Sequence, residues 1–346
     1  MSSRSESHEA AGRLTIDRTI RSLLGRSGSV RRLVLSRLLI MPVVLLGATF
    51  LVFMLVDLSP ENPAFAKLGV FANAAQRQRF AVANHLNRPL LVRYVEFIND
   101  VVHLRLGNSF VRPETVAFLM RISLPPTLQL TLMASIIAVT ISIALASAAA
   151  LRDGKPTDRV ISSGVAFLQA APDFVVGIVA LEVLGVILHV VPAGGYHPWG
   201  SGFGPWFSTI IVPSSVLALP FIASMTRVLR ASLVDELAKD YVRTALGAGV
   251  PKIKIVLRNV LPNAVLPALT VLGLRIGWLL GGAILVENVF NIPGLGMLLI
   301  TAVNNDDLAI VRAVALFGGV VFVVINLIVD VAYILVDPRL RRSSGA

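Results

Sequence analysis

The chain has no cysteine among its 346 residues, and only 15% of them are charged and 7% aromatic. The absence of cysteine excludes disulfides, zinc–thiolate sites and thiol catalysis. With 55% hydrophobic residues and a mean hydropathy of +0.78, the low charge content excludes a soluble globular domain. The net charge of +11 does not indicate nucleic-acid binding, because the basic residues flank apolar runs and aromatic stacking platforms are scarce. The composition therefore indicates an integral membrane protein.

Apolar runs of about membrane length divide the chain. A helix needs roughly 20 residues to cross the hydrocarbon core, where its backbone groups can bond only within the helix. We therefore predict an all-α, polytopic membrane protein with about six transmembrane helices. The expected spans are residues 38–57, 127–150, 161–188, 210–229, 262–285 and 312–336. Ala171-Pro172, just before Asp173, could break the third span.

The segment before the first span is rich in serine, arginine and glycine and has no apolar core. Such a composition is typical of disorder, so we predict a disordered cytoplasmic tail over residues 1–35. The transmembrane domain is then expected to cover residues 36–342.

The lysines and arginines beside the spans predict the orientation. Sixteen of them lie on one side: Arg31, Arg32, Arg37, Arg152, Lys155, Arg159, Arg227, Arg230, Lys239, Arg243, Lys252, Lys254, Arg258, Arg339, Arg341 and Arg342. The short loops on the other side, 189–209 and 286–311, contain none. Because such residues gather in cytoplasmic loops, both termini are predicted to be cytoplasmic and the long loop 58–126 external.

The external loop holds one expected amphipathic helix, which begins after Pro89. Its apolar face comprises Leu90, Leu91, Tyr94, Val95, Ile98, Val101 and Val102. The helix could lie on the outer membrane surface or on the spans. It could also contact an external receptor or gate the outer mouth.

Residues 230–261 form an unusually polar connection between the fourth and fifth spans. Gly247 and Gly249 can take positive φ and end a first helix, and Pro251 suits the first turn of a second. The second helix runs into the fifth span at Leu261-Pro262. We therefore predict a tight hairpin of two short helices.

The charges of this hairpin leave two interpretations open. Asp235 and Glu236 are expected early in the first helix, where the helix dipole favours anions, and basic residues follow on the second. One interpretation is a rigid knob that receives mechanical work from a soluble partner. The other is a surface hairpin that binds anionic lipid headgroups.

The stretch from Asp240 to Pro267 resembles the signature of the membrane-spanning subunits of ATP-binding-cassette importers. Ala245, Gly249 and Leu261-Pro262 occupy the positions of its small residue, its glycine and its Leu-Pro element. The commonest form begins Glu-Ala-Ala, whereas the Asp-Tyr-Val-Arg-Thr-Ala found here is usual in the peptide and nickel branch. Further matches cover roughly residues 35–342: Arg88-Pro89-Leu90, Leu124-Pro125-Pro126-Thr127-Leu128, Glu287 with Pro293-Gly294-Leu295-Gly296, and Asp337-Pro338-Arg339-Leu340-Arg341.

The resemblance implies a type I importer permease fold in a prokaryotic cytoplasmic membrane, with the hairpin seated in a groove of an ATPase subunit. The implied coupling residues are Asp240, Tyr241, Arg243, Ala245, Gly249, Leu261 and Pro262. The implied partners are a second homologous permease, two ATPase subunits, an external substrate-binding protein and membrane lipid. Di- or oligopeptides are the expected substrate, with nickel as the main alternative; five histidines without a cluster favour peptides.

The energy source is expected to lie outside this chain. No G-x-x-x-x-G-K-[ST] loop is present, and Gly154-Lys155 is followed by Pro156, so ATP and Mg²⁺ are expected on the partner ATPases and no cofactor or metal here. A self-sufficient transporter would need intramembrane ion sites and often has an inverted repeat, and no clear repeat is found in the sequence. An intramembrane enzyme is disfavoured because the spans hold no paired catalytic carboxylates and no Ser/His arrangement.

Three glycines at four-residue spacing, Gly273, Gly277 and Gly281, form a smooth stripe along the fifth span. Such stripes let another helix approach closely. The partner helix could belong to this subunit or to the second permease across a dimer.

Four polar residues in or beside the spans are candidates for the translocation pathway: Glu182, Arg275, Glu287 and Asn326. Charges at membrane depth usually face protein or water. Arg275 could attract a substrate carboxylate, or pair structurally with Asp330 or a partner chain. Glu182 could meet a peptide ammonium group, whereas Glu287 could simply be a solvated span end.

Overall fold

The computed structural model describes residues 42–55, 67–68 and 71–336. Within these ranges the chain is helical, with no strand beyond an isolated antiparallel bridge between Asn108 and Thr115. The predicted all-α class is therefore confirmed for the described residues. The expected tail, 1–35, and the motif at 337–341 lie outside them.

The described helices follow one another in chain order. In order they are Pro42–Leu55, α3 (Ala74–Ala83), α4 (Leu90–Val102), α5 (Val116–Leu151), α6 (Pro156–Ala170), α7 (Asp173–Ala180), the π-helix η1 (Leu181–Ile187), the 3₁₀-helix η2 (Trp199–Ser201), α8 (Phe203–Leu237), α9 (Asp240–Gly247), α10 (Lys252–Ile255), the π-helix η3 (Val256–Val260), α11 (Leu261–Val289), α12 (Leu295–Asn304) and α13 (Leu308–Val336). The predicted spans 127–150, 210–229, 262–285 and 312–336 lie inside α5, α8, α11 and α13.

By length and hydropathy alone, three described helices could cross a membrane: α5, α8 and the Leu308–Val329 part of α13. The bent pair that starts at α6 makes a fourth if it counts as one span. The total of about six spans stays a prediction, because this count includes neither α11 nor the first expected span, 38–57, which is described only over 42–55.

The third expected span, 161–188, is not one continuous helix. It consists of α6 and the α7–η1 segment, which are bent by 96° relative to each other. Ala171 and Pro172 at the break have extended backbones. Proline has no N–H for the helix ladder and disfavours the helical conformation in the residue before it, so the sequence itself forces this joint.

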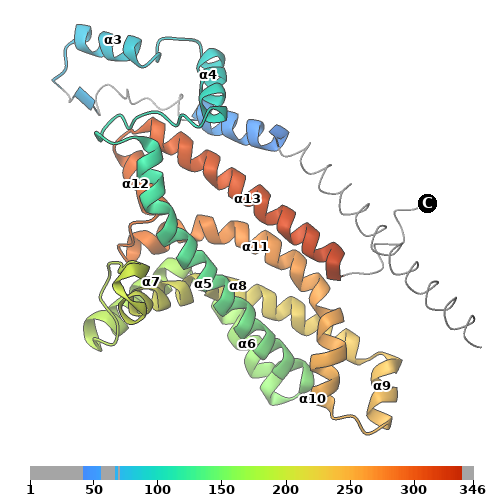
Figure 1. Ribbon diagram of the computed structural model, residues 1–346. Coiled ribbons are helices and arrows are strands. Elements are labelled where there is room, and N and C mark those ends of the chain that lie inside the picture. The colour runs from blue at the N-terminus through green and yellow to red at the C-terminus, as the bar shows by residue number, and fades with distance from the viewer. Residues whose placement is uncertain (1–41, 56–66, 69–70, 337–346) are drawn as a thin grey trace, which may run out of the picture.

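The core of the bundle lies where α5 packs along α8, with α11 crossing both (Figure 1). Fully buried alanines line the contact, including Ala134, Ala138 and Ala218. The Ser142 hydroxyl donates to the Ile222 carbonyl at 3.3 Å, and the Ser214 hydroxyl donates to the Leu130 carbonyl at 3.3 Å. Small side chains and hydroxyl bonds of this kind are how helices associate in lipid.

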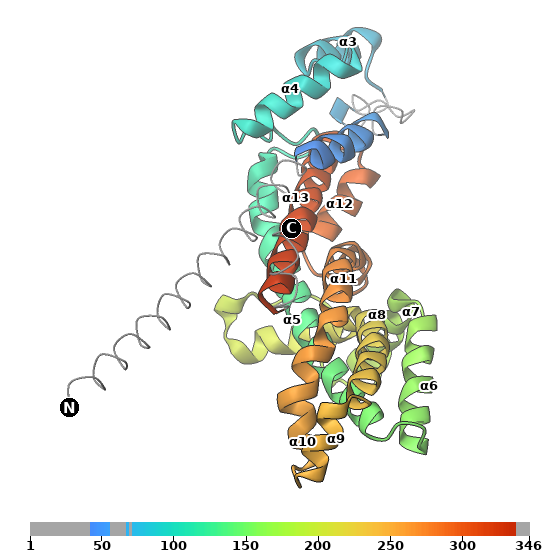
Figure 2. The same ribbon diagram turned by 90° about the vertical axis from the view of Figure 1, so that its right-hand side faces the viewer.

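The two polar parts of the molecule lie at opposite ends of the bundle. α3 and α4 lie at one end, and α9 and α10 lie at the other (Figures 1 and 2). α4 begins after Pro89, as predicted. It packs on the helix Pro42–Leu55 through Tyr94, whose hydroxyl donates to the Leu46 carbonyl at 2.7 Å and whose ring meets Phe53 edge-on. Leu91 and Val95 on its outer face stay exposed.

Candidate functional site

The polar hairpin has the predicted helix–turn–helix form, but its first helix begins later than expected. α8 continues to Leu237, because Leu229 and Leu233 keep burying the same face. Asp235 and Glu236 therefore lie at the C-terminal end of α8 and not early in a hairpin helix, so that expectation was wrong. The acidic residue in the first turn of α9 is Asp240.

The turn depends on one glycine. Gly249 has φ +77°, a backbone conformation that disfavours every residue with a side chain, and Pro251 then precedes α10. Gly247 is still helical and does not supply the positive φ that the sequence suggested.

The hairpin has a buried inner face and a bare outer face. On the inner face, Val242 and Ile255 are each 1% exposed, while Ala245 and Leu261 pack against the same buried cluster. The other five expected coupling residues are exposed: Asp240, Tyr241, Arg243, Gly249 and Pro262. Three large apolar side chains are also exposed on the outer face: Leu246, Ile253 and Leu257.

Glu236 ties the start of the hairpin to α8. The Tyr241 hydroxyl donates to Glu236 Oε1 at 2.9 Å, and the Lys239 ammonium pairs with the same carboxylate. Partial burial, and then the hydrogen bond to Glu236, raise the pKa of Tyr241 above its usual range.

The joint between the hairpin and α11 is the π-helix η3. Pro262 follows it and has no N–H, which interrupts the regular helical ladder. The Asn263 side-chain amide donates to the Asn259 carbonyl at 2.9 Å. Single-turn π-helices are often found at functional sites.

An ion-pair cluster joins α6 and α8 near the hairpin. Arg230 Nε and Nη2 donate to Asp158 Oδ1 and Oδ2 at 2.5 and 2.6 Å, and Nη2 also reaches Asp153 Oδ1 at 2.8 Å. The Asp158 side chain is only 6% exposed and also accepts the Gly154 N–H at 3.0 Å. The hydrogen bonds from Arg230 lower the pKa of Asp158 from 3.8 to about 2.

We expect this cluster to lose its contribution to stability only in strong acid. The pKa of Asp158 is lower in the folded state, so the contribution is present above pH 3.8 and is lost as the pH falls through about 2. Thermal unfolding of wild type and Asp158→Asn should therefore give a constant difference in Tm above about pH 5 and a shrinking one below it. A Tm difference that stays constant into strong acid would contradict this assignment; Asp153→Asn, which alters the exposed partner, is the control.

This cluster was not predicted from the sequence, where Arg230 served only as an orientation charge and Asp158 was not a candidate. The available signal was an aspartate in the first turn of a helix that begins at Pro156. Nothing local indicated that its partner would come from α8.

The three glycines of the α11 stripe do not share one environment. A Cβ at Gly273 would lie 2.9 Å from Val329 Cγ1, and one at Gly277 would lie 2.4 Å from Phe322 Cδ2, so both glycines pack against α13 of the same subunit. A Cβ at Gly281 would meet nothing within 4 Å. Gly277 and Gly281 also line a cavity of about 260 Å³.

Glu287 is not a solvated span end, since its exposed fraction is 0%. Its carboxylate accepts the Thr127 hydroxyl at 2.6 Å and the N–H groups of Gly296 and Met297 at 2.7 and 3.1 Å. Thr127 Oγ1 in turn accepts the Leu295 N–H at 2.8 Å. This Glu287 clasp caps the N-terminus of α12 and joins it to α5 and α11.

The other three pathway candidates lie apart from the clasp. Glu182 is exposed on η1, and the Asn326 amide donates to the Phe322 carbonyl at 2.8 Å. Arg275 is half-buried on α11, and no hydrogen bond or ion pair joins it to another described residue. The side chain of Asp330, its expected partner, lies outside the described residues. The structure therefore does not gather the four candidates into one site, and their pathway role stays a prediction.

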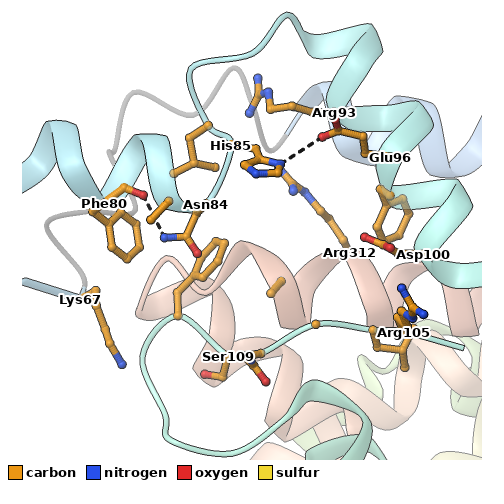
Figure 3. A pocket seen from close by; sticks show the side chains of 18 residues that line it. Lys67, Phe80, Asn84, His85, Arg93, Glu96, Asp100, Arg105, Ser109 and Arg312 are labelled. Carbon is orange, nitrogen blue, oxygen red and sulfur yellow. Dashed lines mark hydrogen bonds and ion pairs between the residues drawn. The ribbon is translucent and has the colours of Figure 1, made fainter.

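A second, larger cavity of about 520 Å³ lies at the α3–α4 end. Its lining carries both signs of charge, including Lys67, Arg105 and Arg312 with Glu96 and Asp100 (Figure 3). His85 Nδ1 lies 3.5 Å from Glu96 Oε2.

Residues 138–342 match the model of the family described as the binding-protein-dependent transport system inner membrane component. The chain belongs to this family. The matched region holds the hairpin, η3 and the Glu287 clasp apart from Thr127. The chain is thus an inner membrane permease component and not the ATPase, and the family agrees with the expected importer-permease fold.

Named relatives of this permease cover most of its length. It is 34% identical to a probable peptide ABC transporter permease protein of Sinorhizobium fredii over 290 residues, which is 84% of this chain and 93% of that protein. It is 34% identical over 301 residues to the oligopeptide transport system permease protein AppB of Bacillus subtilis, covering 86% and 95%. Among solved structures, an inward-facing MetNI methionine ABC transporter matches 68% of this chain and 100% of that chain, with 17% identity and a TM-score of 0.49.

Proposed function

We propose that this chain is a permease subunit of an ATP-driven peptide importer, in which it forms half of the translocation pathway. Membership of the family and the peptide-permease names of relatives from two organisms support the proposal. The observation that carries it is the hairpin α9–α10, whose inner face is buried against the bundle while its outer face is bare. Motion applied to the outer face therefore passes into the spans.

The outer face suits a protein groove better than a lipid surface. It presents Leu246, Ile253 and Leu257 beside the basic residues Lys252 and Lys254. Asp240, whose side chain is 99% exposed, adds a negative charge that anionic headgroups would repel. A groove of mixed polarity on an ATPase subunit can accommodate both kinds of residue.

The proposed assembly contains a second homologous permease, two ATPase subunits and an external substrate-binding protein. ATP and Mg²⁺ bind to the ATPase subunits, and no cofactor is assigned to this chain. The hairpin end faces the cytoplasm together with both termini, and the α3–α4 end faces outward, as the distribution of lysine and arginine predicts. Closure of the ATPase subunits pushes the hairpin and switches the pathway between its two access states.

The proposal is tested with the assembled complex in lipid, supplied with peptide and the external binding protein. We expect ATP hydrolysis to rise when peptide is present, and Gly249→Pro to reduce that rise about tenfold, because proline cannot adopt φ +77°. Gly247→Ala is the matched control, since Gly247 is helical and a Cβ there meets nothing within 4 Å.

Two results would contradict the proposal, the first in whole and the second in its choice of substrate. One is a chain that purifies without ATPase subunits and moves peptide without ATP. The other is a complex whose ATP hydrolysis responds to nickel and its binding protein but not to peptides. In that case nickel, not peptide, is the substrate, and the permease role is kept.

A further inference from the structure

The hairpin is joined covalently to two helices of the bundle. α8 runs into α9 across Ala238 and Lys239, and α10 continues through η3 directly into α11. α6 packs against α8 and has no such covalent link to the hairpin. Side-chain contacts nevertheless connect the hairpin with α6 in two steps.

The first step joins α9 to α8. Val242 on α9 is 1% exposed and belongs to the same buried cluster as Leu233 on α8. Glu236, near the end of α8, accepts the Tyr241 hydroxyl and pairs with Lys239 at either side of the α9 start. Apolar packing and hydrogen bonds thus hold α9 against the end of α8.

The second step joins α8 to α6. Arg230 is about two helical turns before the end of α8. Two of its nitrogens donate hydrogen bonds to the Asp158 carboxylate, at 2.5 and 2.6 Å. A two-point contact between guanidinium and carboxylate fixes orientation as well as distance. Asp158 also binds the Gly154 N–H, so the connection between α5 and α6 is held by the same carboxylate.

The far end of α6 is a joint. α6 ends at Ala170, and the backbone turns by 96° before α7. The regular helical ladder stops at Pro172, which cannot donate to it. α6 can therefore follow α8 without carrying α7 along as a rigid rod.

We propose that Arg230 and Asp158 are positioning residues that make α6 move with α8 and the hairpin. ATPase closure then drives α11 through η3 and α8 through its connection to α9, and α6 follows α8 through this ion pair. The inference rests on the proposed function, because it assumes that the hairpin receives the ATPase motion.

The test measures peptide transported per ATP hydrolysed by the whole complex in lipid vesicles, for wild type, Arg230→Gln and Arg227→Gln. Arg227 is the matched control: it is one turn earlier on α8 and also reaches α6, but through the neutral Gln169 and on an exposed surface. We expect Arg230→Gln to lower the ratio about tenfold while subunit assembly is retained, and Arg227→Gln to leave it unchanged. Exchanging the charges, as Asp158→Arg with Arg230→Asp, should restore most of the ratio.

The outcomes separate this inference from the proposed function. If wild type shows no peptide-dependent ATP hydrolysis, the proposed function and the inference that rests on it are both wrong. If wild type is coupled and Arg230→Gln is equally coupled, only the inference fails. Should Arg230→Gln not assemble, the exchanged pair decides: assembly with recovered coupling supports the inference, and any other result overturns it.

Discussion

Replacing Glu287 with alanine is expected to lower the Tm of the purified permease by roughly 5–10 °C. The buried carboxylate accepts three hydrogen bonds, from Thr127, Gly296 and Met297. Alanine leaves these donors without an acceptor at the start of α12, where the helix dipole favours a negative group. Loss of such a buried acceptor costs about 3 kcal/mol or more, because the orphaned donors stay buried. Thermal unfolding in detergent, followed by the loss of helical signal, measures the shift.

Glu287→Gln is the matched variant for this expectation. Glutamine has the same shape and keeps one acceptor oxygen, so it can still bind the Gly296 and Met297 N–H groups but loses the negative charge. Its Tm should lie between those of wild type and the alanine variant. A Tm for Glu287→Ala within the error of wild type would show that the clasp contributes nothing to folding.

The parts of the hairpin that could be predicted from sequence are those fixed by local chemistry. The positive φ of Gly249 and the position of Pro251 follow from what these two residues allow on their own. The break after Ala171 has the same origin. The start of the hairpin could not be predicted, because α8 ends where its burial against the bundle ends, and that burial is a tertiary property.

The Glu287 clasp could not be predicted from the sequence for a related reason. Thr127 precedes Glu287 by 160 residues, and the two meet only because α5, α11 and α12 converge. The sequence offers an acidic residue at the edge of a span, which fits a solvated span end more readily than a pathway residue. Its burial decides against the solvated end. The buried carboxylate also explains why residue 294 is a glycine, since a Cβ at Gly294 would lie 2.2 Å from the Glu287 carboxyl carbon.

The glycine stripe shows the limit of a spacing argument. Gly273, Gly277 and Gly281 share one face of α11, and the four-residue period predicts close approach along that whole face. α13 contacts the first two, but Gly281 lies beside the 260 Å³ cavity. The spacing identifies the face but not how far along it the neighbouring helix follows.

Gly296→Ala is expected to prevent stable folding or to cost about 3 kcal/mol or more. A Cβ at Gly296 would lie 2.4 Å from the Ile284 Cα and 2.9 Å from Glu287 Oε2. The first of these atoms is backbone in α11 and cannot turn away as a side chain could. α12 must therefore move off α11, which pulls the Gly296 and Met297 N–H groups away from Glu287 and weakens the clasp at the same time.

Gly281→Ala separates this steric effect from the general effect of adding a methyl group to a helical glycine. Gly281 lies on α11 only a few residues from the clasp, yet a Cβ there meets nothing within 4 Å, so its alanine variant should keep or slightly raise the Tm. The yield and Tm of the two variants, purified side by side, check the prediction. Equal stability of Gly296→Ala and Gly281→Ala would mean that α12 can shift freely against α11, and that the close contact at Gly296 is not required for the fold.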